Sequence, residues 1–310
     1  MEKVIIYTPT YRNEHIFSLV LDSYLRQTYE NIEVRIFDNS LADGFDCIQR
    51  ICSQKSDPRL IYISNNSQIG AHGNGSRILG SVDFNSLAMV LASDMALADK
   101  AVEELISLRA STGAPIIMPA TRNYSSSRLK EYPGRNFFDQ PFESLQPLSE
   151  SITTLQSLSV LEKYYGYDNL SGEFFKFSFF GCLFDGALIA GLGRNYLRFK
   201  FHGGEQYLSM NLLVRAGSIT YSPSELLWNF YGHQRIGGTQ RLDSDIGRME
   251  CILACQMILE ENEFFLLAEG IDIIGMRKNQ IDKAIYFKNH FRGFEKYADD
   301  IIERNKFFIQ

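Results

Sequence analysis

Two residue types that can do chemistry stand in the second half of the chain, in the segment from His202 to Arg235. Glu205 follows Gly203 and Gly204 at the start of a helix-length run, and His233 stands 28 residues after it. Carboxylate and imidazole side chains are among the groups that most often transfer protons in enzymes. We expect this segment to present both groups to one cleft.

Polar side chains also follow four strand-like runs in the first half of the chain. They are Thr8, Pro9, Thr10, Tyr11 and Arg12 after the first run, Asp38 and Asn39 after the second, Asn65 and Asn66 after the third, and Ser93 and Asp94 after the fourth. An aromatic ring can stack on a base, and a carboxylate can accept from a ribose hydroxyl or hold a metal beside a pyrophosphate. Each residue alone could be only a turn or cap residue, but four polar strand ends together favour a binding edge.

Strand and helix patterns alternate over the first 120 residues, which predicts right-handed βαβ units and a mostly parallel sheet of the α/β class. The predicted strands cover 3–7, 33–37, 60–64, 87–91 and 115–118, and the predicted helices cover 16–26, 45–52, 73–79 and 100–108. Ligands bind at the carboxyl ends of the strands in such a sheet. The polar strand ends are therefore expected on one edge.

The rest of the chain is less regular. A long excursion is expected over 118–150, a helix over 151–165 and an aromatic strand over 174–184. Helices are expected over 246–260, 264–274 and 280–308. We interpret 1–240 as one domain, with a first half to residue 120 and a second half over 121–240, and 241–310 as a helical extension. The extension either caps the domain or contacts a partner or a membrane surface through its aromatic and basic side chains.

Composition excludes several functional classes. The chain has 31 basic and 37 acidic residues and a net charge of −6, which argues against a nucleic-acid footprint. Five cysteines without paired zinc-like spacing indicate reduced thiols, and no run is apolar enough for a membrane span. We expect a cytoplasmic protein, with peripheral contact at the inner membrane face as an alternative.

Several motifs carry a family resemblance. TPTYRN (8–13), LDSYLRQTYENIEVRIFDNSLADG (21–44), NNSQIGAHGN (65–74) and LASDMAL (91–97) resemble the nucleotide-sugar half of GT-A glycosyltransferases of the large family that includes bacterial polysaccharide synthases. FFGCLFDGALIAGLG (179–193) and HGGEQYLSMNLLVRAG (202–217) through YGHQR (231–235) are similar to the polypeptide GalNAc-transferases and related GlcNAc-transferases. The resemblance covers residues 3 to 235, so it implies a GT-A fold followed by a C-terminal helical extension.

The resemblance assigns roles to individual residues. It implies a nucleotide-sugar site that contains Pro9, Thr10, Tyr11, Arg12, Asp38, Asn39, Gly70, Asn74, Ser93 and Asp94. Pro9 and Tyr11 fall in the base pocket, Asp38 at the uracil edge or ribose, and Gly70 and Asn74 on the diphosphate side. The acceptor side would contain Gly203, Gly204 and Trp228, although Trp228 could instead pack under the metal loop.

The resemblance also implies a divalent metal, Mn²⁺ or Mg²⁺, held by Asp94 and His233. The acidic motif departs from the family pattern, because Ala92-Ser93-Asp94-Met95 holds one carboxylate. Asp94 takes the metal-binding position when the motif is aligned to the GalNAc-transferases. Met95 takes that position when the motif is aligned to the polysaccharide synthases.

Glu205 is the expected catalytic residue. In an inverting enzyme it would deprotonate the acceptor hydroxyl as a general base, and in a retaining enzyme the equivalent glutamate would orient the substrates. It could also only complement the positive end of the helix dipole.

Two hypotheses follow. The first is a glycosyltransferase of the hexosyltransferase type that moves a sugar from a nucleotide sugar, expected to be a UDP-sugar, to a hydroxyl on a glycan or protein. The second is a catalytically silent GT-A domain that serves as a binding or assembly subunit. A nucleotidyltransferase is disfavoured, because no glycine-rich, basic triphosphate loop follows the first strand.

Overall fold

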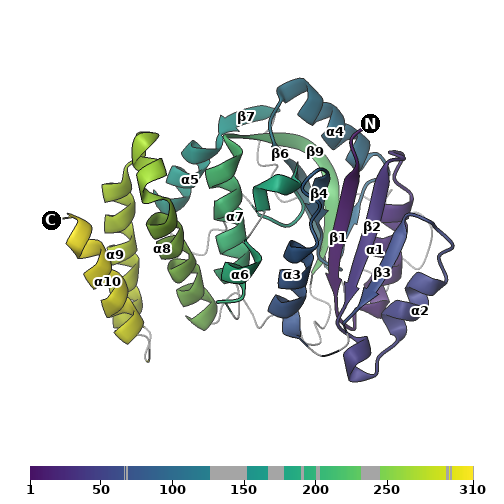
Figure 1. Cartoon of the computed structure of the whole chain (residues 1–310), viewed down its shortest axis with the longest axis horizontal. Helices are drawn as coiled ribbons and strands as arrows, with labels where there is room; N and C mark the ends of the chain where they lie inside the picture. The colour runs from purple at the N-terminus through teal and green to yellow at the C-terminus, as the bar shows by residue number, and fades with distance from the viewer. Residues whose placement is uncertain are drawn as a thin grey trace. The chain divides into compact units, whose positions relative to one another are not determined.

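The computed structural model describes residues 1–65, 67, 69–125, 152–166, 178–189, 192–199, 203–231, 245–290, 293 and 295–309. The chain divides into two compact units (Figure 1). Unit 1 comprises Met1–Thr154, Phe180–Gly193 and Ile219–Gly238, and unit 2 comprises Leu155–Phe179, Arg194–Ser218 and Thr239–Gln310. The domain boundary at residue 240 that the sequence favours stays a prediction.

Unit 1 is built on a mixed sheet. In the described part of the chain the strand order is β3-β2-β1-β4-β8-β6-β9-β5, and β7 pairs with β9. The first four strands in this order are parallel, β8 is antiparallel to both its neighbours, β6 and β9 are parallel, and β5 is antiparallel to β9. The strands are β1 Val4–Thr10, β2 Ile32–Asp38, β3 Leu60–Ser64, β4 Leu87–Val90, β5 Met95–Leu97, β6 Ile116–Ser125, β7 Thr153–Gln156, β8 Leu183–Asp185 and β9 Ser218–Tyr231.

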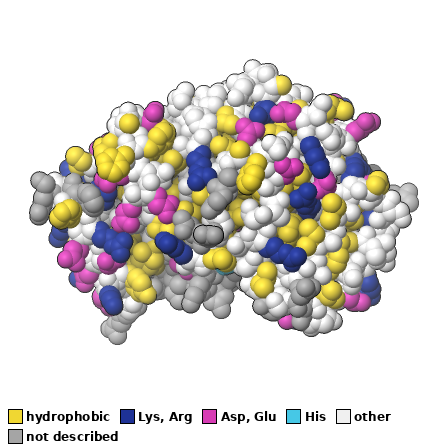
Figure 2. Space-filling model, in the orientation of Figure 1, with side chains coloured by type: hydrophobic (Ala, Val, Ile, Leu, Met, Phe, Trp, Pro, Cys, Tyr) yellow, Lys and Arg dark blue, Asp and Glu magenta, His cyan; other side chains and the backbone are white. Residues whose placement is uncertain are grey.

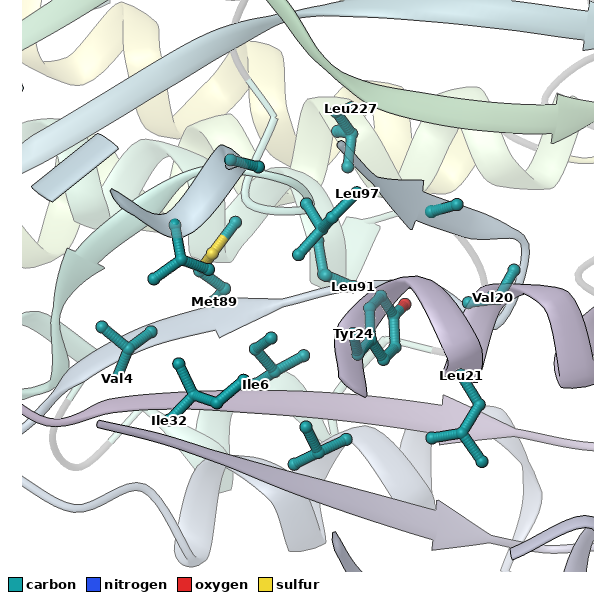
Figure 3. Close-up of a cluster of buried hydrophobic side chains, with 14 of the residues drawn as sticks. Val4, Ile6, Val20, Leu21, Tyr24, Ile32, Met89, Leu91, Leu97 and Leu227 are labelled. Atoms are coloured by element: carbon teal, nitrogen blue, oxygen red, sulfur yellow. The ribbon is translucent and has the colours of Figure 1, made fainter. Parts of the chain in front are cut away.

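Helices cover both faces of the parallel strands, which explains why β1 reads as an unbroken apolar run. Helix α1 (Glu14–Leu25) buries apolar side chains at helical spacing against one face, and Figure 3 shows its Tyr24 next to Ile6 of β1, with Val20 and Leu21 on one side of the cluster and Val4 of β1 at the other. Helix α3 (Gly70–Gly80) contacts β1 and β2. Helices α2 (Cys47–Ser53) and α4 (Ala101–Thr112) complete the helices of this part of unit 1 that the structure describes.

Unit 2 is helical. It contains α5 Ser157–Gly166, α6 Gly193–Tyr196, α7 Gly203–Ala216, α8 Asp245–Ala268, α9 Ile273–His290 and α10 Glu295–Ile309. Helix α8 packs on both α7 and α9, and α10 packs on α9 (Figure 1). A small apolar core of Met249, Ile252, Ala284, Phe287, Ala298 and Ile301 joins the last three helices.

Several sequence-based boundaries differ from the structure. Strand β6 continues to Ser125, inside the expected excursion, and in the described part of the expected strand over 174–184 only β8 begins, at Leu183. Residues 153–156 pair as strand β7, and helix α5 begins only at Ser157. The predicted helix over 264–274 is wrong, because α8 continues to Ala268 and a turn with Gly270 at φ 76° follows. The predicted final helix divides into α9 and α10, with Gly293 at φ 92° between them. Glycine tolerates this left-handed conformation, so it ends helices readily.

On the face that Figure 2 shows, the acidic and basic side chains of the described residues are interspersed. They form no large patch of one charge there. Within the described ranges, no helix is both long and apolar enough to cross a membrane.

Candidate functional site

The carboxyl ends of β1 and β2 meet in parallel register, with Thr10 opposite Asp38 and the Asn39 N–H donating to the Thr10 carbonyl at 3.1 Å. Asp38 is fully buried, and its two carboxylate oxygens accept from the Ser40 N–H at 2.7 Å and the Tyr62 hydroxyl at 2.8 Å. Burial raises the pKa of the Tyr62 phenol, and the hydrogen bond to Asp38 raises it further. The carboxylate is therefore fixed by its own turn and by the neighbouring strand β3.

An aromatic and ionic cluster lies directly beyond these strand ends. Arg12 has a positive φ of 45°, and its N–H donates to the Ser40 hydroxyl at 2.8 Å. Its guanidinium carbon lies 4.9 Å from the Tyr11 ring centroid and 3.6 Å from that of Phe45. Asp43 accepts from the Tyr11 hydroxyl at 2.7 Å and from Arg12 at 3.2 Å. A strained backbone held in place by several contacts often marks a functional position.

Three buried asparagines connect β2 and β3 with α3. The Asn65 amide donates to Asn39 Oδ1 and Asn74 Oδ1, both at 3.1 Å, and the Asn74 amide donates to the Phe37 carbonyl at 2.8 Å. The Arg77 guanidinium donates to Asn65 Oδ1. The network holds the first two turns of α3 against the strand ends.

Pro9 and Gly70 lie beside this network. Pro9 pairs with Phe37 one residue before the end of β1, where its missing N–H is tolerated. Gly70 begins α3 at φ 68°, and a Cβ built on it would meet no heavy atom within 4 Å. Its requirement for glycine is therefore one of backbone conformation, and the space beside it is open.

The acidic turn, formed by the motif Ala92-Ser93-Asp94-Met95, is hydrogen-bonded to the same edge. The Asn13 amide donates to the Ser93 carbonyl at 3.0 Å and to its hydroxyl at 3.1 Å. Asp94 is 5% exposed, and its carbonyl accepts from the Phe230 N–H at 2.8 Å. Strand β5 then pairs with β9, which places Trp228 opposite Ala96. Trp228, predicted on the acceptor side, thus lies beside the strand that follows the acidic turn.

The predicted metal ligands are described only in part. Asp94 is an oxygen ligand of the kind that Mg²⁺ and Mn²⁺ prefer, while His233 lies outside the described residues. No three His, Cys, Asp or Glu side chains of the described ranges gather as a metal site would require. The described ligand set is therefore a single carboxylate, that of Asp94.

Glu205 lies in unit 2, in the first turn of α7. A Cβ on Gly203 would lie 2.4 Å from the Phe199 ring, and one on Gly204 would lie 2.7 Å from the Tyr196 ring. Both glycines are required by these close approaches. Burial raises the pKa of the Tyr196 phenol, and the negative charge of Glu205 raises it further.

Unit 1 brings together the predicted nucleotide-sugar residues, from Pro9 to Asp94, with Trp228 near the acidic turn. Gly203, Gly204 and Glu205 form a separate group in unit 2. Sequence reasoning missed Asn13, Ser40, Asp43, Phe45 and Tyr62. Signals were present for three of them, because Asn13 ends the TPTYRN motif, Ser40 belongs to the polar turn cluster Asp38-Asn39-Ser40, and Asp43 precedes Gly44.

Comparisons with known proteins agree with this architecture. The structure resembles that of Staphylococcus aureus TarS 1-349 in complex with UDP-GlcNAc, with a TM-score of 0.63 and 13% identity over 94% of this chain and 75% of that chain. TarS 1-349 in complex with UDP gives a TM-score of 0.59 at 12% identity, with 94% and 74% covered. These likenesses show the GT-A fold. The search of curated proteins found no match.

The family model described as "Glycosyl transferase family 2" matches residues 5–179. This range covers the parallel strands β1 to β4 from Ile5 onward, the asparagine network and the acidic turn, and it ends before α7. The GalNAc-transferase likeness of the segment around Glu205 stays a prediction. Because the match covers more than half of the 310 residues, the chain belongs to glycosyl transferase family 2.

Proposed function

We propose that this protein transfers a sugar from a UDP-sugar to a hydroxyl group on a glycan or protein. The observation that carries the proposal is the hydrogen-bonded edge where β1, β2, β3, α3 and the acidic turn meet in a chain of this family. The TarS structures contain UDP-GlcNAc or UDP, which supports a uridine nucleotide as the donor here.

Several groups at this edge suit a nucleoside diphosphate. The Thr10 hydroxyl is buried and has no hydrogen-bond partner among the described residues, so a ligand oxygen could satisfy it. Tyr11 and Arg12 offer an aromatic ring and a cation, and Asp38 offers a carboxylate already fixed in position. The open space at Gly70 suits the approach of a phosphate group.

In the proposed reaction, Glu205 accepts the proton of the acceptor hydroxyl. The acceptor oxygen forms a bond to the sugar C1 while the bond from C1 to the diphosphate oxygen breaks, and UDP leaves with the bonding electron pair. General-base assistance of this kind contributes roughly 100-fold to 10,000-fold. A divalent metal held by Asp94 and His233 would, when bound, neutralise charge on the leaving diphosphate.

Donor screening by nucleotide release tests the proposal. With a panel of UDP-, GDP- and dTDP-sugars, we expect release from a UDP-sugar and its loss in Asp94→Ala and Glu205→Ala. Wild-type rates in both variants would refute the site assignment, and release from GDP-sugars alone would refute the uridine role of Asp38.

Calorimetry with UDP, in the presence and absence of Mn²⁺, distinguishes an active glycosyltransferase from a catalytically silent subunit. Absence of binding under both conditions would favour a silent subunit, to which the single carboxylate of the acidic motif also points. Partner or membrane contact through the C-terminal helices and a cytoplasmic location remain predictions.

A further inference from the structure

The first turn of α7 is held by helix α8 as well as by α6. The Gly203 N–H donates to the Glu250 carboxylate at 3.4 Å. Such an N–H in the first turn has no partner inside its own helix and needs one from elsewhere. Glu250 lies in α8, 47 residues further along the chain, and supplies it.

Steric fit supports the same contact. A Cβ on Gly203 would lie 2.7 Å from both the Cβ and the carbonyl oxygen of Glu250. Such distances are too short for any real side chain, so glycine alone permits this approach of α8. The Phe199 ring lies 2.4 Å from the same Cβ position. The first residue of α7 is thus in close contact with α8 and with the segment that follows α6.

Electrostatic neighbours indicate that Glu205 is part of the same group of side chains. Burial raises the pKa of the Cys251 thiol most, Cys255 adds to this, and the negative charges of Glu205 and Glu250 raise it further. Lys283 of α9 acts in the opposite direction. Both carboxylates therefore act electrostatically on the same thiol.

We propose that Glu250 is a positioning residue for Glu205, which makes α8 part of the catalytic machinery. Glu250 holds the Gly203 N–H, and so fixes the turn from which the Glu205 carboxylate projects. The inference deepens the proposed function and rests on the assignment of Glu205 as the base.

The matched control lies on the same helix pair. The Tyr207 hydroxyl donates to Glu261 at 2.8 Å, so Glu261→Ala removes an α7–α8 hydrogen bond away from the first turn. Glu250→Gln keeps a carbonyl oxygen that can accept from Gly203, whereas Glu250→Ala does not.

The experiment measures kcat and KM with the UDP-sugar identified by the release screen, together with thermal stability. We expect Glu250→Ala to lower kcat by about 10-fold to 100-fold, the scale of a small misplacement of a catalytic group, with donor KM unchanged. Glu250→Gln should restore kcat, and Glu261→Ala should leave it unchanged. An unaltered kcat in Glu250→Ala, or an equal loss in Glu250→Gln, would overturn the proposal.

Hydrogen–deuterium exchange gives a test that needs no substrate. Exchange across 203–209 should increase in Glu250→Ala and stay as in wild type in Glu250→Gln. Unchanged exchange in Glu250→Ala would overturn the proposal. Glu205→Gln is measured in parallel: wild-type activity there would refute the role of Glu205 itself, whereas lost activity there with full activity in Glu250→Ala would refute only Glu250.

Discussion

The strand-end edge of unit 1 and the first turn of α7 in unit 2 are held in place by different means. Side-chain hydrogen bonds fix Asp38, Asn65 and Asn74 at the edge. Close packing of Tyr196 and Phe199 against glycines shapes the turn that carries Glu205. A hydrogen-bonded site depends on specific polar groups, whereas a packed turn depends on the absence of side-chain volume. The two regions should therefore respond to different substitutions.

The largest expected effect separates binding from chemistry. Glu205→Gln should lower kcat by roughly 100-fold to 10,000-fold, because the amide cannot accept the proton. UDP affinity, measured by calorimetry, should stay at the wild-type value if the strand-end edge alone binds the nucleotide. A weakened UDP affinity in Glu205→Gln would show that the two regions do not divide the work in this way.

Substitutions at two glycines test how much the absence of side-chain volume matters in each region. Gly203→Ala should lower the free energy of unfolding by about 1–3 kcal/mol, the usual cost of overpacking, because its Cβ would overlap Phe199 and Glu250. Gly70→Ala has free space and should lose only about 1 kcal/mol from its left-handed conformation. Urea denaturation measures both. Equal losses would mean that Phe199 and Glu250 move aside at little cost, so that close packing does not require glycine at position 203.

The asparagine network tests the role of hydrogen bonds. Asn65→Ala removes the donor to Asn39 and Asn74, and unsatisfied buried polar groups cost about 1–3 kcal/mol. We expect lower stability and weaker UDP binding together, since the network shapes the edge. Asn262→Ala, which removes a side-chain bond to the Ile258 carbonyl within α8, is the control and should leave UDP binding intact. Unchanged UDP binding in Asn65→Ala would separate the network from the ligand site.

The smallest expected effect concerns the ring beneath Arg12. Phe45→Leu removes a cation–π contact worth about 0.5–1 kcal/mol at an exposed site, which corresponds to a roughly twofold to fivefold higher Kd for UDP. Phe84→Leu, a change at a side chain that is 60% exposed, should not alter the Kd. Equal effects of the two variants would mean that Phe45 does not position Arg12 for the nucleotide.

The strand-end edge was largely predictable from sequence, because apolar runs followed by polar residues define parallel strands and their carboxyl ends. Strand β3 has the predicted bounds, Leu60–Ser64. Phe45 and Tyr62 were not predicted. Phe45 follows a short 3₁₀ turn, and Tyr62 stands in the middle of strand β3, where an aromatic side chain is equally expected in a core. The side chain that a turn places against the strand ends depends on the backbone geometry of that turn, which the residue types alone do not specify.

The surroundings of Glu205 were predictable in residue type but not in contacts. The two glycines indicated a close approach, yet nothing in the sequence identified Tyr196, Phe199 or Glu250 as the neighbours. These contacts join residues up to 47 positions apart on separate helices. Local patterns cannot specify such pairings, because helix packing is decided by the whole apolar surface of each helix.

The register of β5 and β9 restricts how this sequence can change over evolution. Met95, directly after Asp94, pairs with Asn229, and Leu97 pairs with Leu227. Insertion or deletion of one residue in this stretch would turn every later side chain of β9 to the opposite face of the sheet. Related sequences should therefore vary by substitution between Leu227 and Asn229, and any differences in length should fall outside the paired residues.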